Sequence, residues 1–254
     1  MKSLIKKIFK NKLAIYFRNL LNIYPVKINT NLLVKNYSIS DSFIWRTDNN
    51  FKTIFKFSDI LNLFYGDKAC NVDLKFYSKE GTLLKDKKNL NINLCNSLII
   101  DKKFMNDIED YGTFSIHHTT QSNHFSIRNS CYTGFSYNNR SYIYVHGNVP
   151  ATAQHFNNSK NKLIKGLIGK TLFLNQTYKI QNNFGNCDYT ELFIHNPCKS
   201  TINFIVDDEK YKLKSDASLI IKIVKQEIEI RSNCYLLRPI IFNYKLDTID
   251  VFHG

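Results

Sequence analysis

Long apolar segments are missing from this chain. No stretch of its 254 residues approaches the roughly 20 consecutive apolar residues that cross a bilayer as a helix. The basic start, MKSLIKKIFKNKLAIYF, is followed by neither a continuous apolar core nor a small-residue cleavage site, so no secretory signal peptide is predicted. We therefore expect a protein of the cytoplasm, either soluble or bound peripherally to the inner face of a membrane.

Cysteine is used sparingly and without pattern. The six cysteines are spread from Cys70 to Cys234 and include no C-x-x-C pair. Zinc-ribbon spacing is therefore absent, and the chain is longer and poorer in cysteine than a disulfide-stapled secreted domain. We expect buried free thiols in a reducing compartment. The spacing predicts neither a metal site nor a cofactor.

The chain also lacks the local motifs of several enzyme classes. It contains no G-x-S-x-G elbow, no phosphate-binding loop, no H-E-x-x-H and no paired-carboxylate pattern. These absences name no reaction and leave open whether the protein is an enzyme.

Aromatic residues and positive charge are abundant instead. The 19 Phe and 15 Tyr, beside only 9 Gly and 4 Pro, favour pleated, half-buried strands. The formal charge of +14 indicates a polar or anionic partner such as a glycan, an anionic lipid or a nucleic acid. Nucleic acid is the weaker alternative, because the lysines are dispersed and no helix-turn-helix or ribonucleoprotein pattern is present. The biased composition of an AT-rich genome would raise the charge equally well.

Residues 1–26 carry the clearest local pattern. Apolar residues from Ile5 to Tyr24 recur at helical spacing, lysines and Arg18 occupy much of the remainder, and Pro25 ends the pattern. This predicts a basic amphipathic α-helix. Residues 1–25 would bind an anionic membrane surface or, alternatively, dock their apolar face on the following domain.

Beyond residue 38 the pattern changes from helical to alternating. Short alternating runs separated by polar turns predict many short strands, with one short helix at FSDILNLF. In the SKEG turn, Gly81 supplies a left-handed position. The spacing predicts an all-β fold in which two consecutive β-sandwich-like modules, 38–150 and 169–254, follow the helix and are joined by a linker, 151–168.

Three histidines lie close together in YGTFSIHHTTQSNH, residues 111–124. Side chains alternate along a strand, so His117 shares a polar face with Tyr111, whereas His118 points to the apolar face. The two adjacent histidines therefore cannot bind one metal ion. His117 and His146, the latter from YIYVHGN, are the candidate acid or base if a reaction is catalysed.

The segment IRNSCYTGFSYNNRSYIYVHGN, residues 127–148, combines aromatic, guanidinium and amide side chains. Aromatic faces stack on sugars or bases, while Arg and Asn hydrogen-bond hydroxyls, carboxylates or phosphates. The alternative is a twisted hairpin with its tyrosine hydroxyls at the solvent edge. We predict a ligand cleft near the module boundary, lined by the two candidate histidines together with Tyr111, Arg128, Tyr132, Tyr144 and Asn148.

These features favour a carbohydrate-related binding or accessory protein at the cytoplasmic face of a membrane, acting in the biosynthesis of a surface polysaccharide. Two other functions fit the same features: a histidine-dependent enzyme acting on a sugar or nucleotide-sugar, and a basic nucleic-acid-binding β protein. The oligomeric state stays open, because exposed edge strands would allow dimers to form.

Overall fold

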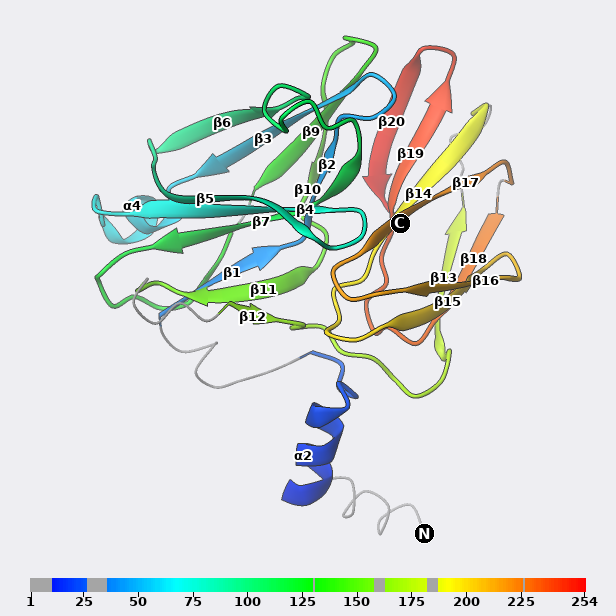
Figure 1. The fold of residues 1–254 in the computed structure, drawn as a ribbon, viewed down its shortest axis with the longest axis horizontal. Helices are drawn as coiled ribbons and strands as arrows, with labels where there is room; N and C mark the ends of the chain where they lie inside the picture. Colours follow the sequence, from blue (N-terminus) through cyan, green and yellow to red (C-terminus); the bar gives the residue numbers. More distant parts are fainter. Residues whose placement is uncertain (1–10, 27–35, 130, 158–162, 182–186, 226) are drawn as a thin grey trace.

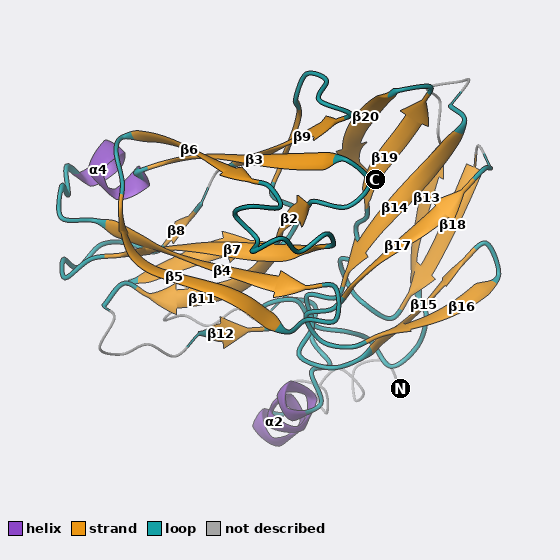
Figure 2. Ribbon diagram, turned by 45° about the horizontal axis from the view of Figure 1, so that its top comes forward, coloured by secondary structure: helices purple, strands orange, loops and turns teal. Residues whose placement is uncertain are grey.

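The computed structural model describes residues 11–26, 36–129, 131–157, 163–181, 187–225 and 227–254. These residues form five four-stranded sheets and two short helices (Figure 1). Figure 2 shows the sheets gathered into two groups, one from residues 37–165 and the other from residues 176–253. The predicted all-β class is confirmed.

The first group contains three sheets. In spatial order, the strands of one sheet are β12 (Ile164–Lys165), β11 (Pro150–His155), β1 (Tyr37–Asp41) and β8 (Ile127–Arg128). Those of a second are β10 (Ile143–His146), β9 (Tyr132–Tyr137), β3 (Phe51–Ser58) and β6 (Cys95–Ile100). Those of the third are β2 (Phe43–Arg46), β7 (Tyr111–Thr119), β4 (Asn71–Ser78) and β5 (Leu83–Asn91). Neighbouring strands are antiparallel, except for the parallel pair β1 and β8.

The second group contains two antiparallel sheets. One consists of β13 (Gln176–Gln181), β18 (Glu227–Ser232), β15 (Ile202–Val206) and β16 (Glu209–Leu213). The other consists of β17 (Ser218–Ile223), β14 (Tyr189–His195), β19 (Ile240–Lys245) and β20 (Thr248–His253). One apolar core draws residues from both sheets, among them Leu192, Phe204 and Ile230. Residues 171–174, TLFL, form no strand, since the chain bends there and leaves Leu172 and Phe173 exposed.

A core rich in phenylalanine lies between the second and third sheets of the first group. In FKTIFKF the alternation turns Phe55 and Phe57 into this core and the two lysines outward, while Phe51, on the same inward face, reaches a neighbouring core. The rings of Phe55 and Phe114 meet edge to face with their centroids 4.8 Å apart, a favoured arrangement for aromatic pairs. The alternating pattern of the sequence therefore corresponds directly to the buried face of β3.

A further apolar core joins the two groups of sheets. Phe51 and Phe135 of the first group contact Phe242 of the second, with ring centroids 5.7 and 5.0 Å apart. The fully buried guanidinium of Arg46 lies at the same junction and donates to Glu191 Oε2 at 2.7 Å. Because apolar side chains from both groups exclude water together, we expect the groups to unfold together.

The segment 151–168, expected to be a linker, contains a strand of the first group. Residues 150–155 form β11, which pairs with β1 on one side and with β12 on the other. Both faces of β11 are covered, since Thr152 and Gln154 are buried as well as Ala153. Residues 151–154 are alternately alanine and a polar residue, but all four are buried, so this strand does not show the half-buried pattern from which strands are predicted. Residues 158–162 lie outside the described part of the chain.

Two local predictions within the first group are confirmed. The short helix expected in FSDILNLF is α4 (Ile60–Tyr65), which begins after Asp59 and ends at Gly66, where φ is 68°. The Asp59 side chain accepts a hydrogen bond from the backbone N–H of Asn62, as an N-terminal cap does. In the SKEG turn Gly81 has a φ of 84°, which favours glycine.

Helix α2 (Lys12–Leu20) lies within the predicted amphipathic segment, whose residues 1–10 are outside the described part of the chain. No residue of α2 is buried, and Figure 1 shows the helix standing away from the sheets. The chain that follows it is tied to the segment between the two groups: Tyr24 Oη donates to Gly166 O at 2.7 Å, and Gly169 N donates to Pro25 O at 3.0 Å. Neither described helix is long and apolar enough to cross a membrane.

Candidate functional site

The predicted ligand segment contains the antiparallel hairpin of β9 and β10. Tyr132 at the start of β9 pairs with His146 at the end of β10, so their side chains share a face. Along β10 the expected alternation is present, with Tyr144 and His146 exposed and Val145 buried. Gly134 makes room for the ring of Tyr144, because a Cβ at Gly134 would lie 2.6 Å from Tyr144 Cε1.

A pocket of about 360 Å³ opens beside Tyr132 and His146, and we call it the Arg128 pocket. Its volume falls in the range of roughly 300–1,000 Å³ that small-molecule sites occupy. Three of its residues were predicted from the sequence, and the others are supplied by neighbouring segments. The pocket is lined by Asp41, Arg128, Asn129, Cys131, Tyr132, His146 and Gly147.

Arg128 and Asp41 form a two-pronged ion pair in this pocket. Arg128 Nε donates to Asp41 Oδ1 at 2.7 Å and Nη2 donates to Oδ2 at 2.8 Å. The hydrogen bond to Asp41 raises the pKa of Arg128 and outweighs the lowering by burial. Gly147 leaves space for the carboxylate, since a Cβ there would lie 2.7 Å from Asp41 Oδ2. Asp41 was missed because it lies 87 positions from Arg128 and carries no local sign of this pairing. Gly147 was missed because nothing in its own segment shows that a carboxylate lies against it.

A second histidine lies against His146. The ring centroids of His146 and His253 are 4.2 Å apart, and His253 Nε2 is 3.1 Å from His146 Nδ1. His253 comes from β20 of the second group, so the pocket lies beside the junction of the two groups. Burial, with smaller contributions from Arg238 and His146, lowers the pKa of His253 to about 4, which keeps it neutral at pH 7. No motif in the sequence distinguished His253.

Three other predicted ligand residues lie away from the Arg128 pocket, which corrects the expectation of one shared cleft. Tyr111 packs edge to face on Phe193 in the core between the groups, with centroids 5.8 Å apart. Tyr144 lies under the ammonium of Lys56, 4.7 Å from the ring centroid. Asn148 is buried, and its amide donates to the backbone carbonyl of Arg238 at 2.6 Å.

His117 was expected to share a cleft with His146, and the structure separates them. The ring of His117 is fully buried, with Nε2 3.1 Å from Thr152 Oγ1 on β11. Burial, followed by Lys75 and His118, lowers the pKa of His117 to about 3. The reason for the error is a layer that the sequence does not reveal: the polar face of β7 is covered by the sheet that contains β11. His118 is also buried, on the opposite face of β7, as predicted.

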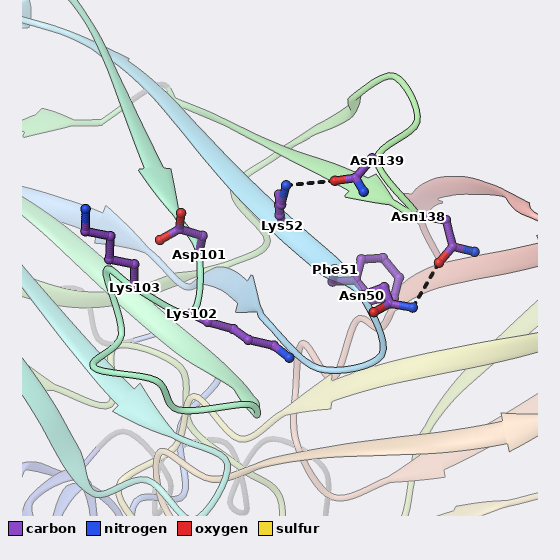
Figure 3. Close-up of a pocket in the computed structure, with 8 residues that line it drawn as sticks. All are labelled: Asn50, Phe51, Lys52, Asp101, Lys102, Lys103, Asn138 and Asn139. Carbon is purple, nitrogen blue, oxygen red and sulfur yellow. Dashed lines mark hydrogen bonds between the residues drawn. The ribbon is translucent and has the colours of Figure 1, made fainter.

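A second polar pocket, of about 460 Å³, lies at the far end of β9 (Figure 3). Lys52 Nζ donates to Asn139 Oδ1 at 2.7 Å, and Asn50 Nδ2 donates to Asn138 Oδ1 at 3.1 Å. Figure 3 shows the Lys102 side chain extending toward Asn50 and Phe51. The ring of Phe51 that borders the pocket is only 2% exposed, so it offers no aromatic face to a ligand. Ammonium and amide groups without an exposed ring suit a small anion better than a sugar.

Comparison with family models, curated proteins and solved structures finds no match to this chain.

Proposed function

We propose that the Arg128 pocket binds a carbohydrate, and that the protein is a binding or accessory protein in the biosynthesis of a surface polysaccharide. One observation carries the proposal: a two-pronged Arg128–Asp41 pair stands beside the exposed ring of Tyr132 in one pocket. Polar groups fixed in one plane next to an aromatic face are the combination that sugar rings require, because sugars present hydroxyls at their edge and C–H groups on their faces.

Each of the three side chains has a distinct part in binding. Asp41 keeps acceptor lone pairs for sugar hydroxyls, while Arg128 Nη1, which makes no hydrogen bond within the described residues, has N–H donors to offer. Tyr132 is 54% exposed, and its ring provides the apolar face. Since the ion pair holds Arg128 and Asp41 in place before the ligand arrives, binding loses little side-chain entropy there.

The alternative of a histidine-dependent enzyme has one supporting feature, since His146 and the carboxylate of Asp41 line the same pocket. A general base needs a carboxylate or imidazole that is free to exchange a proton with the substrate. Both oxygens of Asp41 accept hydrogen bonds from Arg128 instead. Asp41 is therefore held for binding, and the enzyme alternative would depend on His146 as its base.

A glycan array probed with the full chain tests the proposal, followed by calorimetric titration of any glycan that binds. Arg128→Ala and Tyr132→Ala should each weaken binding at least tenfold, about 1.4 kcal/mol. Lys102→Ala is the matched control for a lost cation, since Lys102 pairs with Glu109 at the second pocket. Tyr144→Ala is the control for an exposed tyrosine on the same hairpin. Binding that survives both pocket variants, or an array without any bound glycan, would disprove carbohydrate binding at this pocket.

We further propose that α2 places the protein on an anionic membrane surface, at the cytoplasmic face. Leu13, Tyr16, Phe17 and Leu20 follow the i, i+3, i+4, i+7 spacing of one helix face, and each is at least half exposed. The apolar face therefore does not dock on the sheets, which was the alternative interpretation of the sequence. Lysines before and within the helix match an anionic lipid surface in charge.

Flotation with lipid vesicles tests the membrane proposal. The full chain should float with vesicles that contain phosphatidylserine and stay in solution with pure phosphatidylcholine. The double variant Leu13→Glu, Phe17→Glu should lose this binding, whereas Leu246→Glu, which changes an exposed leucine in the distant β19–β20 turn, should keep it. Equal flotation of both variants would remove the helix from the explanation. Steep loss of affinity for DNA or RNA with salt, without flotation, would favour a nucleic-acid-binding protein instead.

We also infer that each group of sheets is a sandwich-like module. The core that includes Leu192 and Phe204 draws side chains from both sheets of the second group. In the first group, the core around Phe55 and Phe114 lies between two sheets in the same way. A third sheet covers the outer face of β7.

A further inference from the structure

A buried histidine without a hydrogen-bond partner marks a place in the first group that the proposed function does not use. The ring of His118, near the end of β7, is 0% exposed, and neither Nδ1 nor Nε2 has an atom in hydrogen-bonding geometry. Desolvation lowers the pKa of His118, and it outweighs the nearby charge of Asp59 and the smaller effects of Asn129 and the Ser58 backbone, which raise it. A polar side chain that is buried without a hydrogen-bond partner destabilises the fold, and a bound ligand or ion would supply the missing partner.

Two further side chains that bind metals surround the His118 ring. Asp59 caps α4 directly after β3, and Cys70 immediately precedes β4, the strand that pairs with β7 at this point. One ligand atom from each of Asp59, Cys70 and His118 lies within 4.8 Å of the other two. The three residues come from three different segments, separated by 11 and 48 positions. That separation is why the ligand spacing of the sequence predicted no metal site.

The chemistry of the cluster matches a divalent ion. A thiolate and a carboxylate carry two negative charges, so a 2+ ion with a neutral imidazole gives an uncharged set, which can be buried without an unpaired charge. Without an ion, burial and then the nearby Asp59 raise the pKa of Cys70, so its thiol stays protonated. Asp59 uses Oδ1 for its helix cap, which leaves Oδ2 as the oxygen that can bind an ion.

We propose that Asp59, Cys70 and His118 bind one structural zinc ion. Zinc favours the sulfur–nitrogen–oxygen set, whereas magnesium and calcium favour oxygen alone. Tetrahedral bonds of about 2.0–2.3 Å place the ligand atoms about 3.3–3.6 Å apart, so closure requires movements of about 1 Å. On binding, the Cys70 thiol releases its proton to solvent and the sulfur bonds to the ion.

The role of the ion is structural because the site is enclosed. Asp59, Cys70 and His118 are at most 6% exposed, and Cys70 packs in one buried apolar cluster with Leu61 and Phe156. A zinc ion here would tie α4 to the paired ends of β4 and β7. Because a structural site is closed by protein ligands, the fourth position would go to the amide oxygen of Asn129, which is buried without a partner and whose side chain lies near His118.

Cobalt titration of the full chain tests this proposal. The protein is stripped with a chelator, then titrated with Co²⁺ and scanned for the visible bands of tetrahedral cobalt and for thiolate-to-cobalt charge transfer in the near ultraviolet. One equivalent of Co²⁺ should saturate both signals, and Zn²⁺ should displace it and raise the melting temperature by mass action. Titration without a charge-transfer band would overturn the proposal.

Matched variants locate the ion. Cys70→Ala and His118→Gln should weaken Co²⁺ binding about 100-fold or more, beyond the effect of losing an outer-shell partner. Cys131→Ala removes another buried thiol, and His117→Gln removes the adjacent buried imidazole on the opposite face, so both should keep the full spectrum. Equal spectra from Cys70→Ala and the wild type would show that the ion binds elsewhere.

If the variants fail to fold, X-ray absorption of the wild-type zinc protein still tests the site. A single sulfur scatterer near 2.3 Å, with nitrogen and oxygen near 2.0–2.1 Å, supports the site. A shell of nitrogen and oxygen alone, or of several sulfurs, refutes it.

Discussion

Replacement of Arg46 by methionine tests how the two groups of sheets are joined. Arg46 is fully buried, and its guanidinium lies 4.0 Å over the ring of Phe51 while it binds Asp48 and Glu191 at 2.7 Å each. Burial alone would lower its pKa, but the hydrogen bond to Asp48 and the nearby charges raise it above the usual value. The side chain is therefore a cation between two carboxylates at the centre of the junction.

The expected loss of stability follows from the two carboxylates that the substitution leaves without an ion-pair partner. Methionine retains most of the contact with Phe51 but leaves Asp48 and Glu191, whose side chains are 16% and 12% exposed, without their cation. Breaking a buried ion pair costs about 3–5 kcal/mol, and the partial hydration of the two carboxylates places the loss near the lower end, at about 3 kcal/mol.

Urea denaturation measures this loss with two probes. Trp45 is the single tryptophan and reports on the first group, whereas far-ultraviolet circular dichroism reports on both groups. The two transitions should coincide in the wild type, and both should shift in Arg46→Met. Because Glu191→Met removes the other half of the bridge, the double variant should lose less than the sum of the single losses, by about 2 kcal/mol. A loss below about 1 kcal/mol for Arg46→Met, or additive losses, would refute the bridge as a source of stability.

Three further predictions concern stability. Burial lowers the pKa of His195 from 6.5 to about 4, so the unfolded chain binds the proton first, and stability falls as pH drops from about 6.5 to 4. The loss is about 3 kcal/mol, and His195→Asn should remove it when urea unfolding is compared at pH 7 and pH 4; equal pH dependence in both proteins would contradict the assignment. The sulfur atoms of Cys198 and Cys234 are 3.6 Å apart, so mild oxidation should link them and stabilise the protein by up to about 4 kcal/mol; mass spectrometry that finds both thiols free would exclude this. A Cβ at Gly112 would lie 2.0 Å from the carbonyl oxygen of Tyr77, so Gly112→Ala should lower stability by about 1–3 kcal/mol, and an unchanged urea midpoint would be evidence against this close approach.

The candidate pocket was accessible to sequence reasoning only in part. Tyr132 and His146 lie on one hairpin, and alternation along a strand is enough to put His146 and Tyr144 on the same exposed face. His117 was misplaced by the same rule. Alternation assigns a face to a side chain, but it does not say whether another sheet covers that face.

The features that could be predicted from the amino-acid sequence are local: the all-β class, the helix after Asp59, the glycine turn at residue 81 and the inward direction of His118. Each of these depends on backbone preference or on the two-residue period of a strand, which a short window contains. The packing of the sheets, by contrast, brings Asp41 to Arg128, places His253 against His146, and gathers Asp59 and Cys70 at His118. These contacts join residues far apart in the chain, and their formation depends on how whole sheets pack, which no local pattern encodes.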